Sequence, residues 1–140
     1  MDDVYVLMLR LALISVAATH LTMGVLAIIS PPKRQADKML KVFYGATLDL
    51  TPQERHLIRM LGAYMIAVAF VSAFAVADPV ARWAIVYGTG ILLLLRGGQR
   101  IVFAREIRAA FGIFPTRMKM QTAFFLLLGA LIVALRLAVG

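Results

Sequence analysis

Hydrophobic positions along the chain form four long runs. They cover residues of about 4–29, 57–77, 80–103 and 118–139. A helix of each length crosses a hydrocarbon layer of about 30 Å, because an α-helix rises by about 1.5 Å per residue. The pattern predicts an all-α fold, a bundle of four transmembrane helices within a single integral membrane domain, residues 1–140.

Local signals predict where two of these helices begin. Thr51, Pro52 and Glu54 have the spacing of a capping box, with Pro at the first helical position of the second span. Asp78 and Pro79 repeat the order of capping residue and Pro before the third span. Because this connection is so short, we expect the second and third spans to form an antiparallel hairpin.

The two long connections are amphipathic. Residues 33–50 place apolar side chains at helical spacing among Lys and Arg, which predicts a helix in the headgroup layer. The Ser-Pro-Pro sequence of residues 30–32 separates it from the first span. After the third span the helical pattern continues as a second amphipathic segment, until residues 112–116 break it with Pro115 as the stop. Both segments are expected on the cytoplasmic side.

Small residues indicate close helix packing. Ala69, Ala73 and Ala77 recur at four-residue spacing in the second span, a pattern that lets helices approach closely in lipid. The tripeptide Leu-Gly-Ala occurs at residues 61–63 and again at 128–130. Both halves of the chain follow the order span, basic amphipathic loop, Pro, span. This echo suggests two helical hairpins related by an axis along the membrane normal. The alternative is a chance recurrence, because short motifs of this kind are common in helical hairpins.

Charge predicts the orientation. The chain has 15 Lys and Arg against 7 Asp and Glu, a formal net charge of +8, and most of the basic residues fall in the two long loops. By the positive-inside rule these loops are cytoplasmic. We expect a multi-pass protein of the bacterial inner (cytoplasmic) membrane, with N- and C-termini periplasmic. The acidic start, residues 1–3, predicts that the first span is retained instead of cleaved.

Composition agrees with lipid as the solvent. The chain is 62% hydrophobic, against about 45–50% in soluble domains. It has no cysteine, so it holds neither disulfides nor thiolate metal ligands. Its basic residues flank apolar spans, which indicates contact with membrane lipids and not with nucleic acid. The expected partners are other integral membrane subunits or further copies of the chain.

His20 is the candidate cofactor contact. It lies inside the first span, with Thr19 and Thr22 beside it. A buried imidazole can ligate a tetrapyrrole, contact a quinone, relay protons, or bond to a neighbouring helix. The bond to a neighbouring helix is the ordinary interpretation, and no cofactor is expected.

Charged residues are expected to meet at the cytoplasmic rim, where the second span begins and the third ends. Glu54 and Glu106 would form ion pairs with the arginines of this rim. Alternatively, Arg59, Arg96 and Arg100 bind a lipid headgroup or another anion, with backbone exposed by the glycines at 97 and 98. These glycines also suit a kink or a close packing point.

Two further arginines lie inside spans. Arg10 is expected to extend its guanidinium to the outer headgroups, with an ion pair to Asp3 or Asp78 as the alternative. Arg136 is expected to mark the outer boundary of the fourth span. The sequence contains no paired carboxylates within a span, no Ser/His/Asp set, no HExxH motif and no phosphate-binding Gly loop, so it predicts neither catalytic residues nor a metal site.

The pattern resembles small bacterial four-helix membrane proteins of the DoxX-like kind. The resemblance rests on the length, the four spans with their charge pattern, the Arg-Met-Leu-Gly-Ala-Tyr sequence at residues 59–64, and the Arg-Gly-Gly-Gln-Arg sequence at 96–100. It implies the four-helix architecture and, for some members, a link to quinone-dependent or redox membrane complexes. It transfers no catalytic residue to this chain.

These observations favour a non-catalytic accessory or assembly subunit of a larger respiratory or photosynthetic complex in the inner membrane. The alternative is a protein that binds or transports a small hydrophobic ligand, such as a quinone, lipid or pigment, between the first two spans near His20. An enzyme is not expected.

Overall fold

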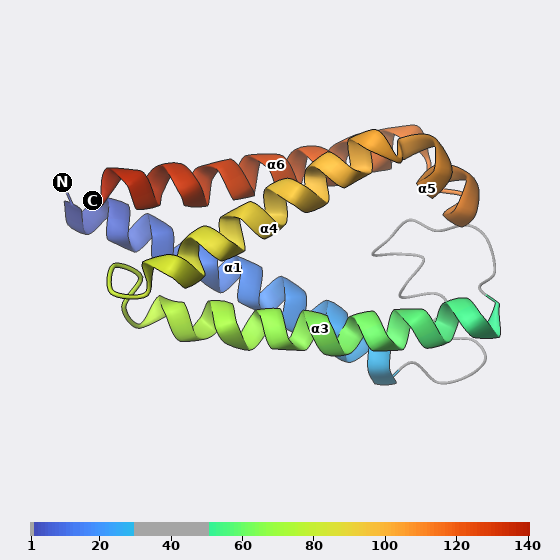
Figure 1. Ribbon diagram of the computed structural model, residues 1–140, viewed down its shortest axis with the longest axis horizontal. Coiled ribbons are helices and arrows are strands. Elements are labelled where there is room, and N and C mark those ends of the chain that lie inside the picture. Colours follow the sequence, from blue (N-terminus) through green and yellow to red (C-terminus); the bar gives the residue numbers. More distant parts are fainter. Residues whose placement is uncertain (1, 30–50) are drawn as a thin grey trace.

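The computed structural model describes residues 2–29 and 51–140, and the regular structure in these ranges is entirely helical (Figure 1). The prediction of an all-α chain is confirmed for these ranges, while the amphipathic segment predicted at 33–50 lies outside them. The helices are α1 (Asp2–Ile29), α3 (Pro52–Val76), α4 (Trp83–Val102), α5 (Ala104–Phe111) and α6 (Pro115–Ala138).

The start of α3 has the predicted capping box. The backbone N–H of Thr51 donates to the Glu54 carboxylate at 2.7 Å, and the N–H of Glu54 donates to the Thr51 hydroxyl oxygen at 3.3 Å. Pro52 occupies the first helical position. Two N–H groups at the start of α3 therefore gain partners within the same turn.

The boundaries of the second half differ in detail from the prediction. Asp78 accepts a hydrogen bond from the N–H of Ala81 at 2.9 Å, but the residues after Pro79 form a turn and α4 begins only at Trp83. The segment after α4 is helical as predicted and forms α5, which Gly112 ends at φ 61°.

The expectation that Pro115 stops a helix is wrong. Pro115 is the first residue of α6. At the first position of a helix an N–H group has no acceptor within the helix, so its absence in Pro costs nothing. The fixed φ of Pro also suits the first turn.

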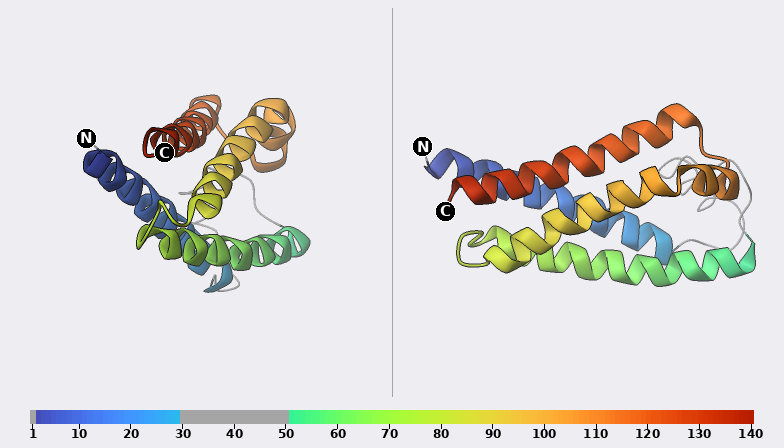
Figure 2. Two further views of the ribbon diagram at one scale, coloured as in Figure 1. Left: turned by 60° about the vertical axis from the view of Figure 1, so that its left-hand side comes forward. Right: turned by 45° about the horizontal axis from the view of Figure 1, so that its top comes forward.

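The four long helices lie in two pairs. α1 packs against α3, α4 packs against α6, and the pairs meet mainly where α1 contacts α6 (Figures 1 and 2). α3 and α4 are joined by a short connection but diverge from it. The hairpin expected from that connection is therefore confined to the region of the turn, and each helix packs chiefly on a partner from its own half of the chain.

Each pair has a glycine contact at its crossing point. A Cβ atom on Gly24 of α1 would lie 2.7 Å from the carbonyl oxygen of Gly62 on α3. A Cβ atom on Gly129 of α6 would lie 2.8 Å from the carbonyl oxygen of Gly90 on α4. We call these contacts the first and second glycine crossings. The repeated Leu-Gly-Ala sequence contributes one glycine to each, Gly62 to the first and Gly129 to the second. The predicted axis that relates the two hairpins stays a prediction.

The core lies toward the end of the molecule that holds both chain ends (Figure 2). There all four long helices contribute buried apolar side chains to one cluster: Leu9, Ala12, Leu13, Val16, Ala75, Val86, Leu93, Ile132 and Leu135. Toward the opposite end, which carries α5 and the start of α3, the two pairs diverge (Figure 1).

Three helices are long and apolar enough to cross a membrane, over Asp3–Ile29, Pro52–Val76 and Pro115–Ala138. These segments agree with three of the four predicted spans. α4 is not among them because its last two turns carry Arg96, Gln99 and Arg100. Many large apolar side chains of these helices face outward, as expected of helices in lipid.

Candidate functional site

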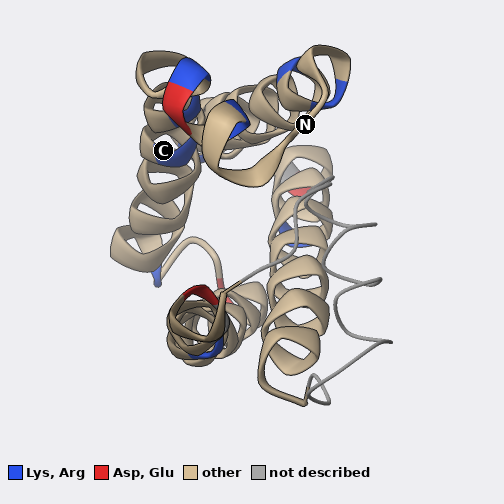
Figure 3. Cartoon of the chain, turned by 90° about the vertical axis from the view of Figure 1, so that its right-hand side faces the viewer, with Lys and Arg blue, Asp and Glu red and all other residues tan. Residues whose placement is uncertain are grey.

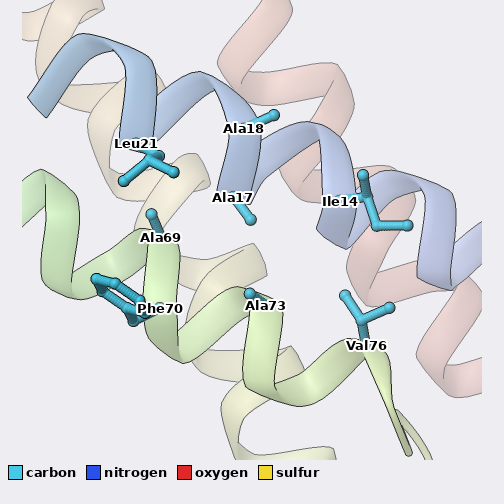
Figure 4. Close-up of a pocket in the computed structure, with 8 residues that line it drawn as sticks. All are labelled: Ile14, Ala17, Ala18, Leu21, Ala69, Phe70, Ala73 and Val76. Atoms are coloured by element: carbon cyan, nitrogen blue, oxygen red, sulfur yellow. The ribbon is translucent and has the colours of Figure 1, made fainter. Parts of the chain in front are cut away.

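An apolar groove lies between α1 and α3 and opens on the outer surface of the molecule (Figure 4). Its volume is about 310 Å³. Half of the side chains that line it are alanines, and the whole set is Ile14, Ala17, Ala18, Leu21, Ala69, Phe70, Ala73 and Val76. We call this feature the α1/α3 groove.

One end of the α1/α3 groove is marked by an arginine. Arg10 lies one helical turn before Ile14, and its guanidinium donates a hydrogen bond to the carbonyl oxygen of Ala77 at 3.3 Å. Ala77 directly follows Val76, the last groove residue of α3. The structure therefore gives Arg10 a backbone acceptor at the end of α3, instead of the ion pair with Asp3 or Asp78 that was the alternative expectation.

Two more arginines bind the same region. Arg82 donates to the carbonyl oxygen of Phe74, and its guanidinium carbon lies 3.5 Å from the centroid of the Phe74 ring. Arg136 donates to the carbonyl oxygen of Val80 at 3.4 Å and lies 5.8 Å from the ring of Tyr87. With 6% of its surface exposed, Arg136 is buried, and it lies in the last turn of α6. That it marks the outer boundary of the fourth span stays a prediction.

All three arginines donate hydrogen bonds to backbone carbonyl groups at or just after the end of α3. The last carbonyl groups of a helix lack intrahelical partners and carry the negative end of the helix dipole. Arg10 and Arg82 supply cationic donors to the end of α3, and Arg136 supplies one to the turn that follows. The arginines come from α1, the connection and α6, so they tie three parts of the chain together at this end.

His20 is buried at the edge of the core. Its Nδ1 donates to the carbonyl oxygen of Val16 at 2.9 Å, within α1, and not to a neighbouring helix. Because a carbonyl can only accept, this bond assigns the proton to Nδ1 in the neutral ring. His20 is not among the residues that line the α1/α3 groove, and Arg96 of α4 lies close enough to act on it electrostatically.

Arg96 and Arg100 share an aromatic ring. Their guanidinium carbons lie 4.7 Å and 6.0 Å from the centroid of Phe125 on α6. Arg100 also donates to the Sδ of Met118 at 3.2 Å and to the side-chain oxygen of Gln121. Both side chains thus bind α6, and cation–π contacts of this kind gain strength away from water.

The glycines at 97 and 98 differ in role. A Cβ atom on Gly97 would lie 2.6 Å from a methyl carbon of Leu126, whereas one on Gly98 would meet nothing within 4 Å. Gly97 is therefore the close packing point that was one of the expected alternatives. Gly97 is buried, and the expected use of the two glycines in an anion site stays a prediction.

The expected rim residues lie at one end of the molecule but not together. Glu54 belongs to the capping box of α3, Arg59 is exposed one turn later, and Glu106 is exposed on α5. α3 and α5 are separated in all views, and Figure 3 shows this end with its Lys and Arg positions in blue. Ion pairs between the two carboxylates and these arginines stay a prediction, as does lipid or anion binding by Arg59, Arg96 and Arg100.

The capping box changes the acidity of Glu54. Hydrogen bonds from the backbone N–H and then from the hydroxyl of Thr51 hold the pKa of this carboxyl below its usual value. Glu54 precedes the apolar part of α3, which begins at Leu57, and its side chain faces water. The effect is local and marks a helix end, not a reactive acid.

Residues 2–29 and 51–140 contain no group of three or more His, Asp or Glu side chains placed to hold a metal ion. No protein-family model matches the chain, and no curated protein or solved structure shows significant similarity to it. The DoxX-like resemblance therefore stays a prediction.

The groove was the feature that sequence analysis missed. Ala69 and Ala73 were recognised as part of a small-residue stripe and interpreted as a helix contact. Ala69 is buried, but Ala73 is exposed and lines the groove, while Ala77 lies beyond it. The adjacent alanines Ala17 and Ala18, in the middle of the first apolar run, were the available signal for a matching recess on α1.

Proposed function

We propose that the chain is a non-catalytic accessory or assembly subunit of a larger respiratory or photosynthetic complex in the bacterial inner membrane. In this proposal it crosses the membrane four times, with both termini periplasmic and both long loops cytoplasmic. α4, the third span in chain order, is included because it packs along α6 and shares a core with the three helices that are apolar enough to cross.

The proposal rests on the observation that the polar side chains of the apolar helices form their hydrogen bonds within the protein. Ionisable residues within a membrane indicate a functional site by default. Here Arg10 and Arg136 donate to backbone carbonyls, Arg100 bonds to α6, and His20 bonds to its own helix. The groove, by contrast, is apolar and opens outward. The surface of such a protein is suited to contact with neighbouring membrane components, and its polar groups are not arranged around a reacting substrate.

Exposed apolar side chains supply the contact surface in this proposal. Large examples on α1 and α3 include Leu11, Leu61, Tyr64 and Phe70, each more than half exposed. In lipid, helix association depends on van der Waals packing and on small residues that allow close approach. Both are available on this side of the molecule.

The test is co-purification from the cells that make the protein. After mild solubilisation, native mass spectrometry should find the chain bound to larger membrane subunits. Phe70→Ala, which removes an exposed side chain of the groove, should weaken this association more than Leu131→Ala on α6. A colourless, monodisperse homo-oligomer without partner or ligand would exclude both this proposal and the alternative.

The α1/α3 groove favours a second candidate, a protein that binds a small hydrophobic ligand such as a lipid, quinone or pigment. The groove lies between the first two spans, where such a ligand was expected, but His20 does not line it. A tetrapyrrole held by His20 would give an absorption band that His20→Ala abolishes. A ligand held by the groove would survive that substitution and be displaced by Ala73→Leu.

A further inference from the structure

The α1/α3 groove is a surface recess, and half of the side chains that line it are alanines. The two helices touch at the first glycine crossing, and from there toward the chain ends the recess opens between them (Figure 4). A surface recess without contacting atoms forfeits dispersion energy. In a bilayer the nearest atoms that can fill it are those of an acyl chain.

The second helix pair carries aromatic side chains at two of the corresponding positions. Gly24 of α1 and Gly90 of α4 occupy corresponding places in the two glycine crossings. Ala17 precedes Gly24 by as many residues as Trp83 precedes Gly90, and Leu21 and Tyr87 correspond in the same way. The rings of Trp83 and Tyr87 contact each other edge to face, with centroids 6.4 Å apart. Where α4 has Trp83, α1 has Ala17, and this small side chain lines the α1/α3 groove and leaves room for an apolar occupant from outside the chain.

The groove ends at a positive charge with spare donors. A guanidinium has five N–H donors, and Arg10 gives a described hydrogen bond only to Ala77. Its side chain is exposed, and Arg82 adds a second guanidinium over Phe74, beside the groove residue Ala73. The nearby Asp78 carboxylate accepts from the N–H of Ala81 instead of from either arginine.

Arg10 lies at a level in the proposed membrane where a lipid headgroup is expected. Its guanidinium reaches the turn that joins α3 to α4, and Trp83 begins α4 at the same end of the molecule. Trp is typical of the membrane–water interface, and an Arg side chain there binds phosphate oxygens through paired N–H groups. The groove then runs from this level toward the middle of the membrane.

We propose that the α1/α3 groove binds one acyl chain of an anionic phospholipid whose phosphate is held by Arg10. The inference rests on the proposed membrane-spanning arrangement and names the ligand of the second candidate function. A lipid fits better than a partner helix because the recess covers only about two turns of each helix, which is about 12 Å, and ends at a cation. A phospholipid combines an apolar acyl chain, which would occupy the groove, with an anionic phosphate group, which would lie at Arg10.

The experiment uses the full chain, one copy per lipid nanodisc. Two phospholipids with the same photoactivatable acyl chain are compared, one with a phosphatidylglycerol headgroup and one with phosphatidylethanolamine. Cross-linked peptides are located by mass spectrometry. Peptides that contain residues 14–21 and 69–76 should be labelled about fivefold more by the anionic lipid, the ratio that one interfacial arginine provides.

Variants separate the headgroup from the chain. Arg10→Gln should remove the preference for phosphatidylglycerol and keep groove labelling, whereas Arg10→Lys should retain most of the preference. Ala73→Leu should reduce groove labelling by both lipids because the larger side chain occupies the recess. Ala134→Leu, at an exposed alanine of α6, is the matched control and should change neither result.

Equal labelling of the groove by the two lipids would overturn the inference, because it would indicate ordinary surrounding lipid. Unchanged labelling in Ala73→Leu would do the same. If Arg10→Gln fails to fold, the labelling of the unaltered chain and of Arg10→Lys by the two lipids still tests the inference.

Co-purification is scored on the same preparations before reconstitution. Retained partners without lipid preference would overturn only this inference. Lipid preference without partners would overturn only the accessory role.

Discussion

A Cβ atom on Gly24 would lie 2.7 Å from the carbonyl oxygen of Gly62, so the backbones of α1 and α3 are in direct contact. The same contact recurs between Gly90 and Gly129 in the second pair. Close backbone approach in lipid replaces the hydrophobic driving force that water supplies to soluble bundles. The glycines are thus the positions where each pair tolerates least change.

Gly24→Ala should destabilise the protein by about 1–3 kcal/mol, the usual cost of overpacking. The added methyl group meets backbone atoms of Gly62 and Ile66, which cannot rotate away. Reversible unfolding in mixed micelles by added sodium dodecyl sulfate measures the change. The control is Gly88→Ala, where a Cβ meets nothing within 4 Å and the substitution should be neutral or stabilising. An equal effect of both substitutions would show that the close contact at Gly24 is unimportant.

Arg136→Met should destabilise the protein by about 1.5–3 kcal/mol, because it leaves the Val80 carbonyl without its charged donor. Arg136→Lys should recover little of this loss, since an ammonium group cannot both reach the carbonyl and stack on Tyr87 as the planar guanidinium does. The same unfolding titration measures both variants. Arg105→Met, at an exposed residue of α5, serves as the control. Wild-type stability in Arg136→Met would show that the hydrogen bond to Val80 contributes nothing to stability.

The capping box predicts a pH dependence at the start of α3. The pKa of the Glu54 carboxyl is lowered, so its contribution to stability is present above the ordinary pKa and is lost as pH falls through the lowered value. The Thr51 amide, which donates to this carboxylate, should report the titration by NMR with a midpoint below about 4.3, the ordinary value for Glu. In Thr51→Ala the midpoint should rise. A midpoint at the ordinary value in the unaltered protein would count against the box.

The proposed topology predicts the activity of alkaline phosphatase fusions, which requires a periplasmic location. Fusions after Asp78 and at the C-terminus should be active, and a fusion after Gly112 should be inactive. Green fluorescent protein fusions should give the reverse pattern. Activity after both Asp78 and Gly112 would show that α4 does not cross the membrane, and an inactive C-terminal fusion would overturn the orientation.

Features that depend on neighbouring residues were predictable from sequence. The capping box of Thr51 and Glu54 was predicted because its hydrogen bonds join residues three positions apart. Pro115 was assigned to the wrong helix because Pro follows one helix end and opens the next with equal ease. The three long apolar segments needed only length and composition.

Features that depend on helix pairing were not predictable in the same way. A short connection does not require close packing, and α3 diverges from α4 because the Gly24–Gly62 contact draws it to α1. The targets of Arg10 and Arg136 are carbonyl groups, and every residue has one, so no sequence pattern identifies them. The groove exists only because Ala17 and Ala73 lie on facing helices.

The arginine contacts have a consequence for the order in which the chain enters the membrane. Arg10 belongs to α1, which is synthesised before α3, but its acceptor, the carbonyl of Ala77, is synthesised only after the whole of α3. A charged side chain without a partner is costly in hydrocarbon. Arg136, by contrast, is synthesised when the Val80 carbonyl is already in place. In the proposed arrangement we expect α1 to remain near the translocation machinery or the interface until α3 arrives, whereas α6 can join a partly assembled protein directly.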